Sequence, residues 1–189
     1  MKCTVIPCGS LRANCCVLQD SAGNAAVADP GGSFQVIKDF LESAGLTVRL
    51  ILLTHGHDDH TGALKQLRDF TGAPVCVHEL DAYRLPVEPD RLLTDGEELE
   101  AGELKIKVIH TPGHTEGSVC YLCENLMLSG DTLFRESIGR TDLPGGDSAK
   151  IMESLDKLMS LDCGDVTVIP GHGNFTTLEH EREFNPFIS

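Results

Sequence analysis

The sequence contains no long hydrophobic run and no leader peptide. Apolar residues make up 41% of its 189 residues, but they occur in short segments. A membrane-spanning helix needs about 20 consecutive apolar residues, and a secretory leader needs a charged start, an apolar stretch and a cleavage site. Because neither pattern is found, we expect a cytoplasmic protein without a membrane partner.

Basic residues are also scarce. The chain carries 15 lysines and arginines against 29 aspartates and glutamates, a formal net charge of −14, and the basic residues form no cluster. Binding to nucleic acid depends on basic side chains that release counterions from phosphates. The composition therefore argues against nucleic acid as a partner or substrate.

No disulfide framework is expected, although the chain has eight cysteines, at positions 3, 8, 15, 16, 76, 120, 123 and 163. Without a secretory leader, cysteines inside apolar runs are better interpreted as buried small hydrophobic residues. Cys120-x-x-Cys123 has no second pair of matching spacing, and its two thiols would lie on opposite faces of a strand. A zinc or redox role for this pair is therefore disfavoured.

No internal repeat, low-complexity tract or linker divides the chain. A length of 189 residues suits one domain with a substantial core, so we predict a single domain over residues 1–189. Residues 84–98 hold two prolines and many charges, which favours a surface loop over a domain boundary. Nothing in the pattern indicates an oligomeric state.

The most informative stretch is an apolar run that stops at a cluster of histidines and aspartates: Leu50-Ile51-Leu52-Leu53-Thr54-His55-Gly56-His57-Asp58-Asp59-His60. In an extended chain His55 and His57 point the same way and can hold one ion, while Gly56 leaves the space between them empty. The apolar spacing of residues 61–70 predicts a helix, which turns Asp59 and His60 in another direction. Two such pairs predict two adjacent metals. A merely polar loop is disfavoured because unpaired imidazoles and carboxylates at a buried strand end are costly.

The hydrophobic pattern predicts alternating strands and helices. Strands are expected near 3–7, 15–19, 25–28, 48–53, 74–78, 104–109, 117–123, 126–129 and 166–170. Helices are expected near 33–44, from about 60, at 79–84 and at 148–160. This order suggests two sheets covered by helices, a mixed α/β (α+β) fold.

The histidine cluster resembles the Thr-His-x-His-x-Asp-His signature of the metallo-β-lactamase superfamily. Three later segments resemble further motifs of that family: Thr111-Pro112-Gly113-His114-Thr115-Glu116-Gly117-Ser118, Ser129-Gly130-Asp131-Thr132-Leu133-Phe134 and Pro170-Gly171-His172-Gly173. The resemblance covers nearly the whole chain. It implies the αββα metallo-β-lactamase sandwich, in which the motif loops converge along one edge of the two sheets.

The resemblance also implies a ligand set for two divalent metal ions, with Zn²⁺ expected and iron or manganese as alternatives. The first metal would be held by His55, His57 and His114, and the second by Asp59, His60 and His172, with Asp131 bridging both. Water between two such cations is acidified enough to act as a nucleophile, and the cations also polarise a carbonyl group. We therefore expect Asp59 and Asp131 to be catalytic residues as well as metal ligands.

Five residues near or outside these motifs carry less information. Asp29 ends an apolar strand, and two interpretations stay open: it orients a ligand imidazole from behind, or it caps the turn before the helix at 33–44. Asp58 is interpreted as solvated or as a contact behind the ligands. His78, His110 and His180 match no ligand position and are interpreted as structural or surface histidines.

A glycine-flanked loop, Gly139-Arg140-Thr141-Asp142-Leu143-Pro144-Gly145-Gly146-Asp147, follows Asp131 closely enough to wall the site. In glyoxalase II a basic residue at a comparable place contacts a glutathione carboxylate. By this resemblance Arg140 is the candidate for binding an anionic substrate. The alternative is that Arg140 pairs with Asp142 or Asp147 and only stiffens the loop.

Among superfamily members the sequence most resembles the glyoxalase II group, especially its short bacterial single-domain hydrolases. The resemblance implies a dinuclear-metal hydrolase, a hydroxyacylglutathione hydrolase-like thioesterase that cleaves small S-acylglutathione-type thioesters with a metal-bound hydroxide. Few residues follow His172. No counterpart of the family's glutathione-binding helical domain is therefore expected, and thioester hydrolysis is better supported than glutathione specificity.

Two other functions stay open. A persulfide dioxygenase would share the histidine motif and a very similar Gly-Arg-Thr-Asp segment, but would use a single iron at the positions of His55, His114 and Asp131. A non-catalytic zinc-binding protein is disfavoured, because closed tetrahedral sites suffice for a structural metal.

Overall fold

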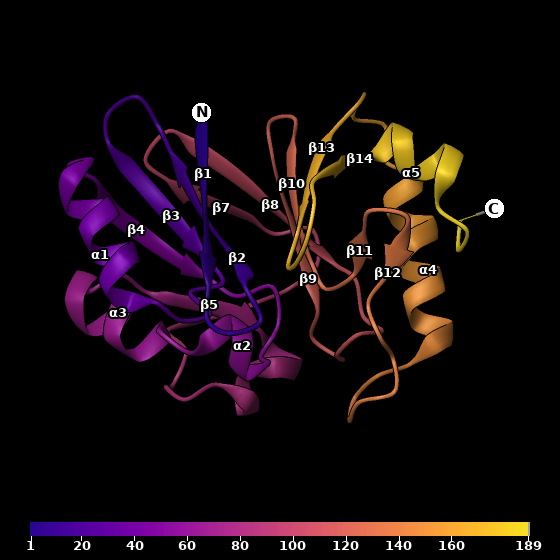
Figure 1. The fold of residues 1–189 in the computed structure, drawn as a ribbon, viewed down its shortest axis with the longest axis horizontal. Helices are drawn as coiled ribbons and strands as arrows, with labels where there is room; N and C mark the ends of the chain where they lie inside the picture. The colour runs from indigo at the N-terminus through magenta and orange to yellow at the C-terminus, as the bar shows by residue number, and fades with distance from the viewer. Residues whose placement is uncertain (189) are drawn as a thin grey trace.

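Two six-stranded sheets face each other in the computed structural model, which describes residues 1–188 (Figure 1). The first sheet contains, in spatial order, β1 (Lys2–Cys8), β2 (Ala13–Gln19), β3 (Asn24–Ala28), β4 (Thr47–Leu52), β5 (Val75–His78) and β6 (Arg91–Leu93). Strands β1 to β3 are antiparallel, whereas β3 to β6 run parallel. The parallel strands direct the loops that follow β4 and β5 to one edge of the sheet.

The second sheet has the spatial order β14, β13, β10, β9, β8, β7. These strands are β7 (Glu98–Ala101), β8 (Leu104–His110), β9 (Val119–Cys123), β10 (Leu126–Gly130), β13 (Thr167–Pro170) and β14 (Thr176–Thr177). Only β10 and β13 pair in parallel. A small hairpin of β11 (Leu133–Phe134) and β12 (Ser137–Ile138) follows β10.

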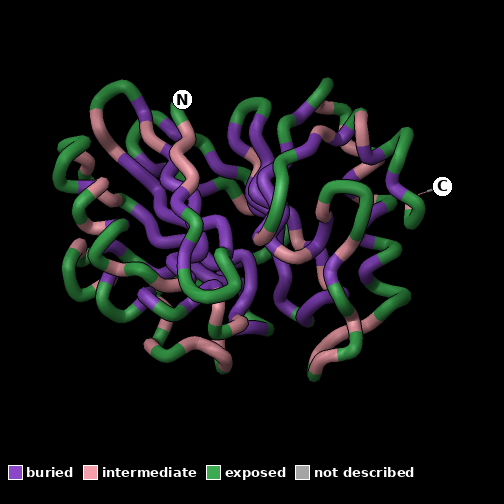
Figure 2. The backbone as a smooth tube through the Cα atoms, viewed as in Figure 1, coloured by how far each residue is buried: buried purple, intermediate pink, exposed green. Residues whose placement is uncertain are grey.

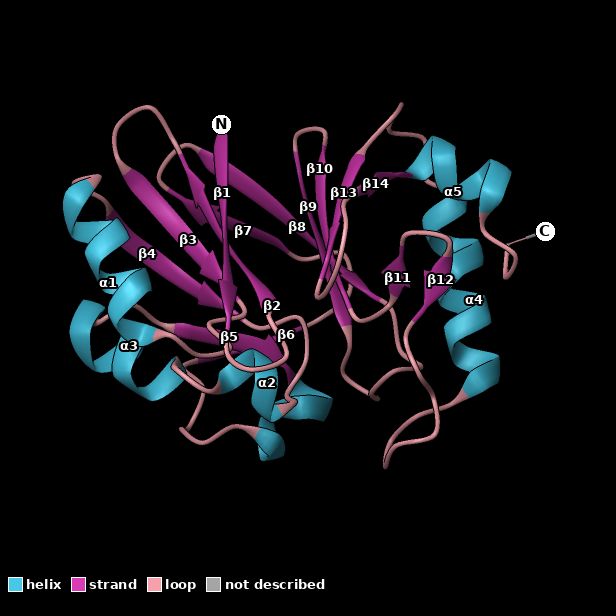
Figure 3. Ribbon diagram, viewed as in Figure 1, coloured by secondary structure: helices cyan, strands magenta, loops and turns pink. Residues whose placement is uncertain are grey.

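Helices cover the outer face of each sheet (Figure 3). Helices α1 (Phe34–Ser43) and α3 (Leu64–Thr71) pack on the first sheet, and α4 (Ser148–Met159) and α5 (Leu178–Phe184) pack on the second. The short helix α2 (Asp58–Thr61) and the 3₁₀ helix η1 (Glu79–Arg84) lie on the first-sheet side, near the edge where the two sheets meet. The expected αββα sandwich is confirmed. Within residues 1–188 no helix is long and apolar enough to cross a membrane.

Most residues of the central strands are buried (Figure 2). Side-chain alternation along these strands builds three hydrophobic layers. On β2, Cys16 and Leu18 point between the sheets, whereas Cys15 and Val17 point toward α1 and α3. This is the two-residue period of a strand that is buried on both faces. The layers pack the two sheets together, and the loops that carry the motifs start at their shared edge.

The cysteines behave as the sequence predicts. All eight are free; six are buried and two, Cys3 and Cys163, are half-buried. Cys120 packs in the layer under α4 and α5, while Cys123 packs between the sheets. The two thiols of the Cys-x-x-Cys pair thus lie on opposite faces of β9.

Several elements differ from the sequence-based expectations. Residues 84–98 were expected to be a surface loop, but they include β6, whose Leu93 is fully buried between the sheets. Because prolines and charged residues flank these three residues, the sequence pattern does not indicate a strand here. Strands β7 and β14, the β11–β12 hairpin and helix α5 were not expected either. The helix expected from about residue 60 is split into α2 and α3 at Gly62, where a Cβ atom would lie 2.7 Å from the Gly31 carbonyl oxygen.

A stacked histidine pair connects the two sheets away from the motif histidines. The rings of His78 and His110 are 4.0 Å apart and nearly parallel. His78 Nδ1 accepts a hydrogen bond from the Leu80 amide and so caps η1. Burial and the neighbouring His110 imidazole lower the pKa of His78.

We expect His78 to make the protein less stable below about pH 6.5. An unfolded histidine has a pKa of about 6.5, so below this pH the unfolded chain binds a proton that folded His78 resists, and the free energy of unfolding falls. His78→Asn keeps a capping acceptor and removes the titrating ring. Urea midpoints at pH 7.5 and 5.5 should therefore differ less in the variant. Equal declines in both proteins would contradict this expectation.

Candidate metal centre

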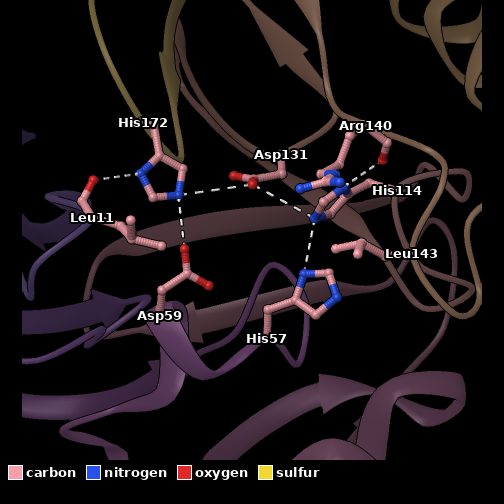
Figure 4. A pocket seen from close by; sticks show the side chains of 8 residues that line it. All are labelled: Leu11, His57, Asp59, His114, Asp131, Arg140, Leu143 and His172. Atoms are coloured by element: carbon pink, nitrogen blue, oxygen red, sulfur yellow. Dashed lines mark hydrogen bonds and ion pairs between the residues drawn. The ribbon is translucent and has the colours of Figure 1, made fainter.

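The motif side chains come from loops that leave the two sheets at their shared edge. His55 and His57 follow β4, and His114, Asp131 and His172 follow β8, β10 and β13. Asp59 and His60 lie in α2, for which His57 is the N-cap residue. Seven side chains that are far apart in sequence therefore converge on one place, as five of them show in Figure 4.

The seven side chains form two groups with one carboxylate between them. Donor atoms lie within 4.8 Å of one another in the groups His55-His57-His114, Asp59-His60-His172 and His55-His60-Asp131. His114 Nε2 is 3.0 Å from His57 Nδ1. His60 Nε2 is 3.2 Å from His172 Nε2.

Asp131 faces both groups. Its Oδ1 lies 3.4 Å from His60 Nε2, and its Oδ2 lies 3.6 Å from His114 Nε2 and 3.8 Å from His172 Nε2. The space beside it exists only because residue 171 is glycine: a Cβ atom there would lie 2.1 Å from Asp131 Oδ1. One carboxylate is thus positioned to serve two cations.

The unsatisfied atoms of the cluster fit divalent cations. His55 Nε2 and Asp131 Oδ1 are buried and have no hydrogen-bond partner among the described residues. Buried polar groups without partners are rare and costly, and these two point into a set of imidazole and carboxylate donors. Such donors suit zinc, iron or manganese. The cluster is therefore able to bind metal.

Contacts behind the cluster fix the direction of four of its five histidine rings. Asp29 accepts hydrogen bonds from the amide and hydroxyl of Thr54 and pairs with His60 Nδ1 at 3.0 Å. This contact orients a candidate ligand from behind, and Asp29 does not cap α1, whose N-cap residue is Ser33. A carboxylate on one ring nitrogen directs the other toward a metal.

Backbone carbonyls and a hydroxyl do the same for three other rings. The Nδ1 atoms of His114 and His172 contact the carbonyl oxygens of Arg140 at 2.8 Å and Leu11 at 3.1 Å. Thr54 Oγ1 lies 3.1 Å from His55 Nδ1. In each case the Nε2 atom is left free to face the cluster.

The electrostatics of the cluster favour bound positive charge. Burial and the neighbouring imidazoles lower the pKa of His55 well below its usual value, so this ring is neutral. Burial opposes protonation of His60, but Asp29 and Asp131 outweigh it and raise its pKa to about 10. The hydrogen bond with His172 lowers the pKa of Asp59 to about 2. When a divalent cation binds, it would replace the protons that these imidazole and carboxylate groups otherwise bind.

An open cavity of about 580 Å³ lies over the cluster. It is lined by Leu11, His57, Asp59, His114, Asp131, Arg140, Leu143 and His172. In Figure 4 the two leucines lie on opposite sides of Asp131. The cavity can therefore hold a small molecule with both an apolar part and a group that contacts the metals.

The side chain of Arg140 is already paired. Its Nε and Nη2 atoms donate to Asp142 at 2.7 and 2.8 Å, and both side chains are more than 60% exposed. Asp147, the other partner considered, instead caps α4 by accepting from the amides of Ala149 and Lys150. Arg140 thus lines the cavity and also stiffens its own loop.

The other residues considered in the sequence lie outside the donor groups, and two residues near the site were not predicted. Asp58 is exposed, which agrees with a solvated side chain. His78, His110 and His180 join none of the three donor groups. Sequence analysis missed Leu11, for which no signal was present, and Asp81, a buried carboxylate in the segment interpreted only as helical.

Comparisons with known sequences agree with the motifs. The family model described as metallo-beta-lactamase superfamily matches residues 9–172. An uncharacterised protein of Mycobacterium leprae is 39% identical over 216 residues, covering 100% of this chain and 99% of the relative. Hydroxyacylglutathione hydrolase GloC of Haemophilus influenzae is 34% identical over 210 residues, covering 100% and 99%.

Solved structures share the fold over nearly the whole chain. BLEG-1 B3 metallo-beta-lactamase has a TM-score of 0.94 at 35% identity and covers 100% of both chains. TTHA1623 in a di-iron-bound form has a TM-score of 0.88 at 35% identity, covering 98% and 100%. ETHE1 from Myxococcus xanthus has a TM-score of 0.87 at 30% identity, covering 98% and 84%. Because the family model matches most of the chain and relatives more than 30% identical align over its whole length, this chain belongs to the metallo-β-lactamase superfamily.

Proposed function

We propose that this protein is a dinuclear-metal hydrolase of small thioesters, similar in activity to glyoxalase II. One observation carries the proposal: the Asp131 carboxylate lies between two groups of metal donors, with oxygen atoms within 3.8 Å of both. The first metal is assigned to His55, His57 and His114, and the second to Asp59, His60 and His172, with Asp131 as the bridge. Zinc is the expected metal, with iron or manganese as alternatives.

The metals would supply the chemistry, and the chain would place the substrate. Two divalent cations acidify water and polarise a carbonyl oxygen. Among the described residues, no serine or cysteine lines the cavity, so no side-chain nucleophile of that kind competes with water. Leu11 and Leu143 would contact the apolar part of the substrate, while Arg140 would bind a carboxylate.

The thioester substrate is supported by relatives and by charge. A relative that aligns over the whole chain is named hydroxyacylglutathione hydrolase. The net charge of −14 would repel an anionic conjugate unless a local cation offsets the field. Arg140 lies at the cavity wall and would supply such a cation when its guanidinium exchanges Asp142 for a substrate carboxylate.

Persulfide dioxygenase is the second candidate, and the Gly139-Arg140-Thr141-Asp142 segment favours it. That reaction would need a single iron at His55, His114 and Asp131. Asp59, His60 and His172 are close enough to hold a second metal, but dioxygenases of this kind keep the second-site residues too, so the bound-metal count has to separate the two candidates. The two candidates therefore differ in metal number and in the use of oxygen.

The test is a paired assay on protein loaded with zinc and, separately, with iron(II). S-lactoylglutathione hydrolysis is followed by thiol release, and glutathione persulfide oxidation by oxygen uptake. Our proposal expects two metals per chain and thiol release without oxygen uptake. One iron per chain with oxygen uptake and an intact thioester would overturn it in favour of the dioxygenase.

Arg140→Ala is expected to raise the KM for glutathione thioesters about tenfold to hundredfold, because the variant lacks the guanidinium that would donate charge-assisted hydrogen bonds to a substrate carboxylate. Turnover of an uncharged thioester and the metal content should change little, because the Arg140 carbonyl that contacts His114 remains in the variant.

Asp142→Asn is the matched variant for this experiment. It removes the exposed internal partner of Arg140, a surface pair whose own contribution is about 0–1 kcal/mol. Releasing the guanidinium should lower the KM for an anionic thioester or leave it unchanged. If both variants weaken charged and uncharged substrates equally, Arg140 acts only as a structural part of its loop.

A further inference from the structure

Asp81 is a fully buried carboxylate beside the metal centre that is not one of the metal donors. It lies in η1 and has no exposed surface. Its Oδ2 accepts hydrogen bonds from the Gly56 amide at 2.8 Å and the Thr115 hydroxyl at 2.8 Å. Its Oδ1 accepts from the Gly117 amide at 3.0 Å and lies 3.5 Å from Arg84 Nε. A buried carboxylate with this many partners is held in a defined position.

The partners of Asp81 belong to two loops of the same donor group. Gly56 lies between His55 and His57, and Thr115 directly follows His114. Within residues 1–188, no hydrogen bond of Asp81 reaches the Asp59-His60-His172 group. Asp81 therefore joins the two loops that carry the first group and makes no hydrogen bond to a side chain of the second.

Glycines let η1 approach these loops closely. A Cβ atom on Gly117 would lie 2.7 Å from the Asp81 amide nitrogen, and one on Gly56 would lie 2.6 Å from Arg84 Cβ. Arg84 fills the space that a side chain at position 56 would need. Arg84 Nη2 also donates to the Pro144 carbonyl at 2.8 Å, which ties η1 to the Arg140 loop.

We propose that Asp81 is a positioning residue that sets the metal affinity of the His55-His57-His114 site. The inference rests on the ligand assignment proposed above. Its physical basis is the hydrogen bonding: two backbone amides and one hydroxyl converge on a carboxylate, and both loops move if this acceptor is lost. Asp29 has the corresponding position for the other group, where it contacts His60 directly.

Asp81→Asn tests this inference with little change in shape. The new NH₂ would replace one of the two carboxylate oxygens, so it would face either the Gly56 amide or the Gly117 amide, and at that position a donor would meet a donor. Zinc affinity is measured by competition with a chelating dye, independently of activity. One of the two zinc sites should weaken about tenfold to hundredfold, the range for residues that orient metal ligands, and the other should change less than about twofold.

Asp20→Asn is the matched control. Asp20 is also a buried carboxylate that accepts from backbone amides, those of Ala22, Asn24 and Glu103, but it lies at the far end of β2 from the metal centre. This variant should lower the thermal stability of the metal-free protein while both zinc affinities stay unchanged. A purely structural role for Asp81 would make the two variants behave alike.

Two single-ligand backgrounds identify the affected site. Added to His172→Ala, which weakens the second site, Asp81→Asn should remove most of the remaining affinity. Added to His114→Ala, it should have no further effect. Thr115→Val deletes one hydrogen bond to Asp81 and should weaken the same site about twofold to tenfold. This variant replaces Asp81→Asn in the test if Asp81→Asn does not fold.

The outcomes separate this inference from the ligand assignment. If the unmodified protein does not bind two zinc ions, the assignment fails. If it binds two and both Asp81→Asn and Thr115→Val bind them with unchanged affinity, Asp81 does not position the first site. A loss confined to the second site would also overturn the inference.

Discussion

Asp131→Ala is expected to remove both metals and to lower thioester hydrolysis by more than about a thousandfold. Asp131 is the residue whose carboxylate oxygens approach both donor groups. Loss of one transition-state donor alone lowers turnover by about 10²–10³ in other enzymes, and here the cations that activate water would be lost as well. Metal content per chain and thiol release with S-lactoylglutathione are the measurements.

His172→Ala is the comparison for this prediction. His172 approaches Asp59, His60 and Asp131, but it belongs to the second donor group alone. The variant should retain about one metal per chain. Asp142→Ala, which removes an exposed carboxylate outside the donor groups, should keep both metals. Retention of two metals in Asp131→Ala would rule out the bridging role.

Metal removal is expected to abolish hydrolysis and to lower the melting temperature by about 5–11 °C per site. A ligand at about 100 times its Kd stabilises the folded state by about 2.7 kcal/mol, and 1 kcal/mol shifts Tm by about 2–4 °C in a chain of this length. The physical source is the cluster itself, which buries His55 Nε2 and Asp131 Oδ1 without partners.

Calorimetry or dye-based melting, before and after chelation and after addition of zinc, measures this effect. Zinc should restore both the melting temperature and the activity, whereas magnesium should restore little, because it prefers oxygen ligands to imidazole. Activity that survives complete chelation would contradict the metal-dependent mechanism. An unchanged melting temperature would show that the buried donors find protein partners instead.

Local chemistry made much of the fold predictable. The continuous apolar runs of β2, β4 and β10 mark strands that are buried on both faces. The elements that the sequence did not predict are short, such as the three residues of β6, or have only a weak apolar periodicity. Leu93 in β6 is buried because another sheet packs over it, and this depends on residues far away in the sequence.

The candidate site, like the fold, could be predicted only in part from local sequence. The alternation of His55 and His57 and the helical turn of Asp59 and His60 are local patterns, so the chain itself indicates two donor directions. That these residues meet His114, Asp131 and His172 was implied by family resemblance and depends on the convergence of four loops. Sequence analysis alone also left open whether Asp29 orients a ligand or caps a helix.

Only the tertiary structure decided which residues stand behind the donors. Asp29 reaches His60 because β3 pairs with β4, and Asp81 reaches Gly56 and Gly117 because η1 packs against loops from both sheets. Hydrophobic periodicity is a property of neighbouring residues, so the sequence by itself determined most of the strands, the donor types and the charge. The Gly56–Asp81 hydrogen bond forms only after β4 and β5 have paired, and the Gly117–Asp81 bond only after the two sheets have packed, because no local pattern specifies which distant amide a buried carboxylate will meet.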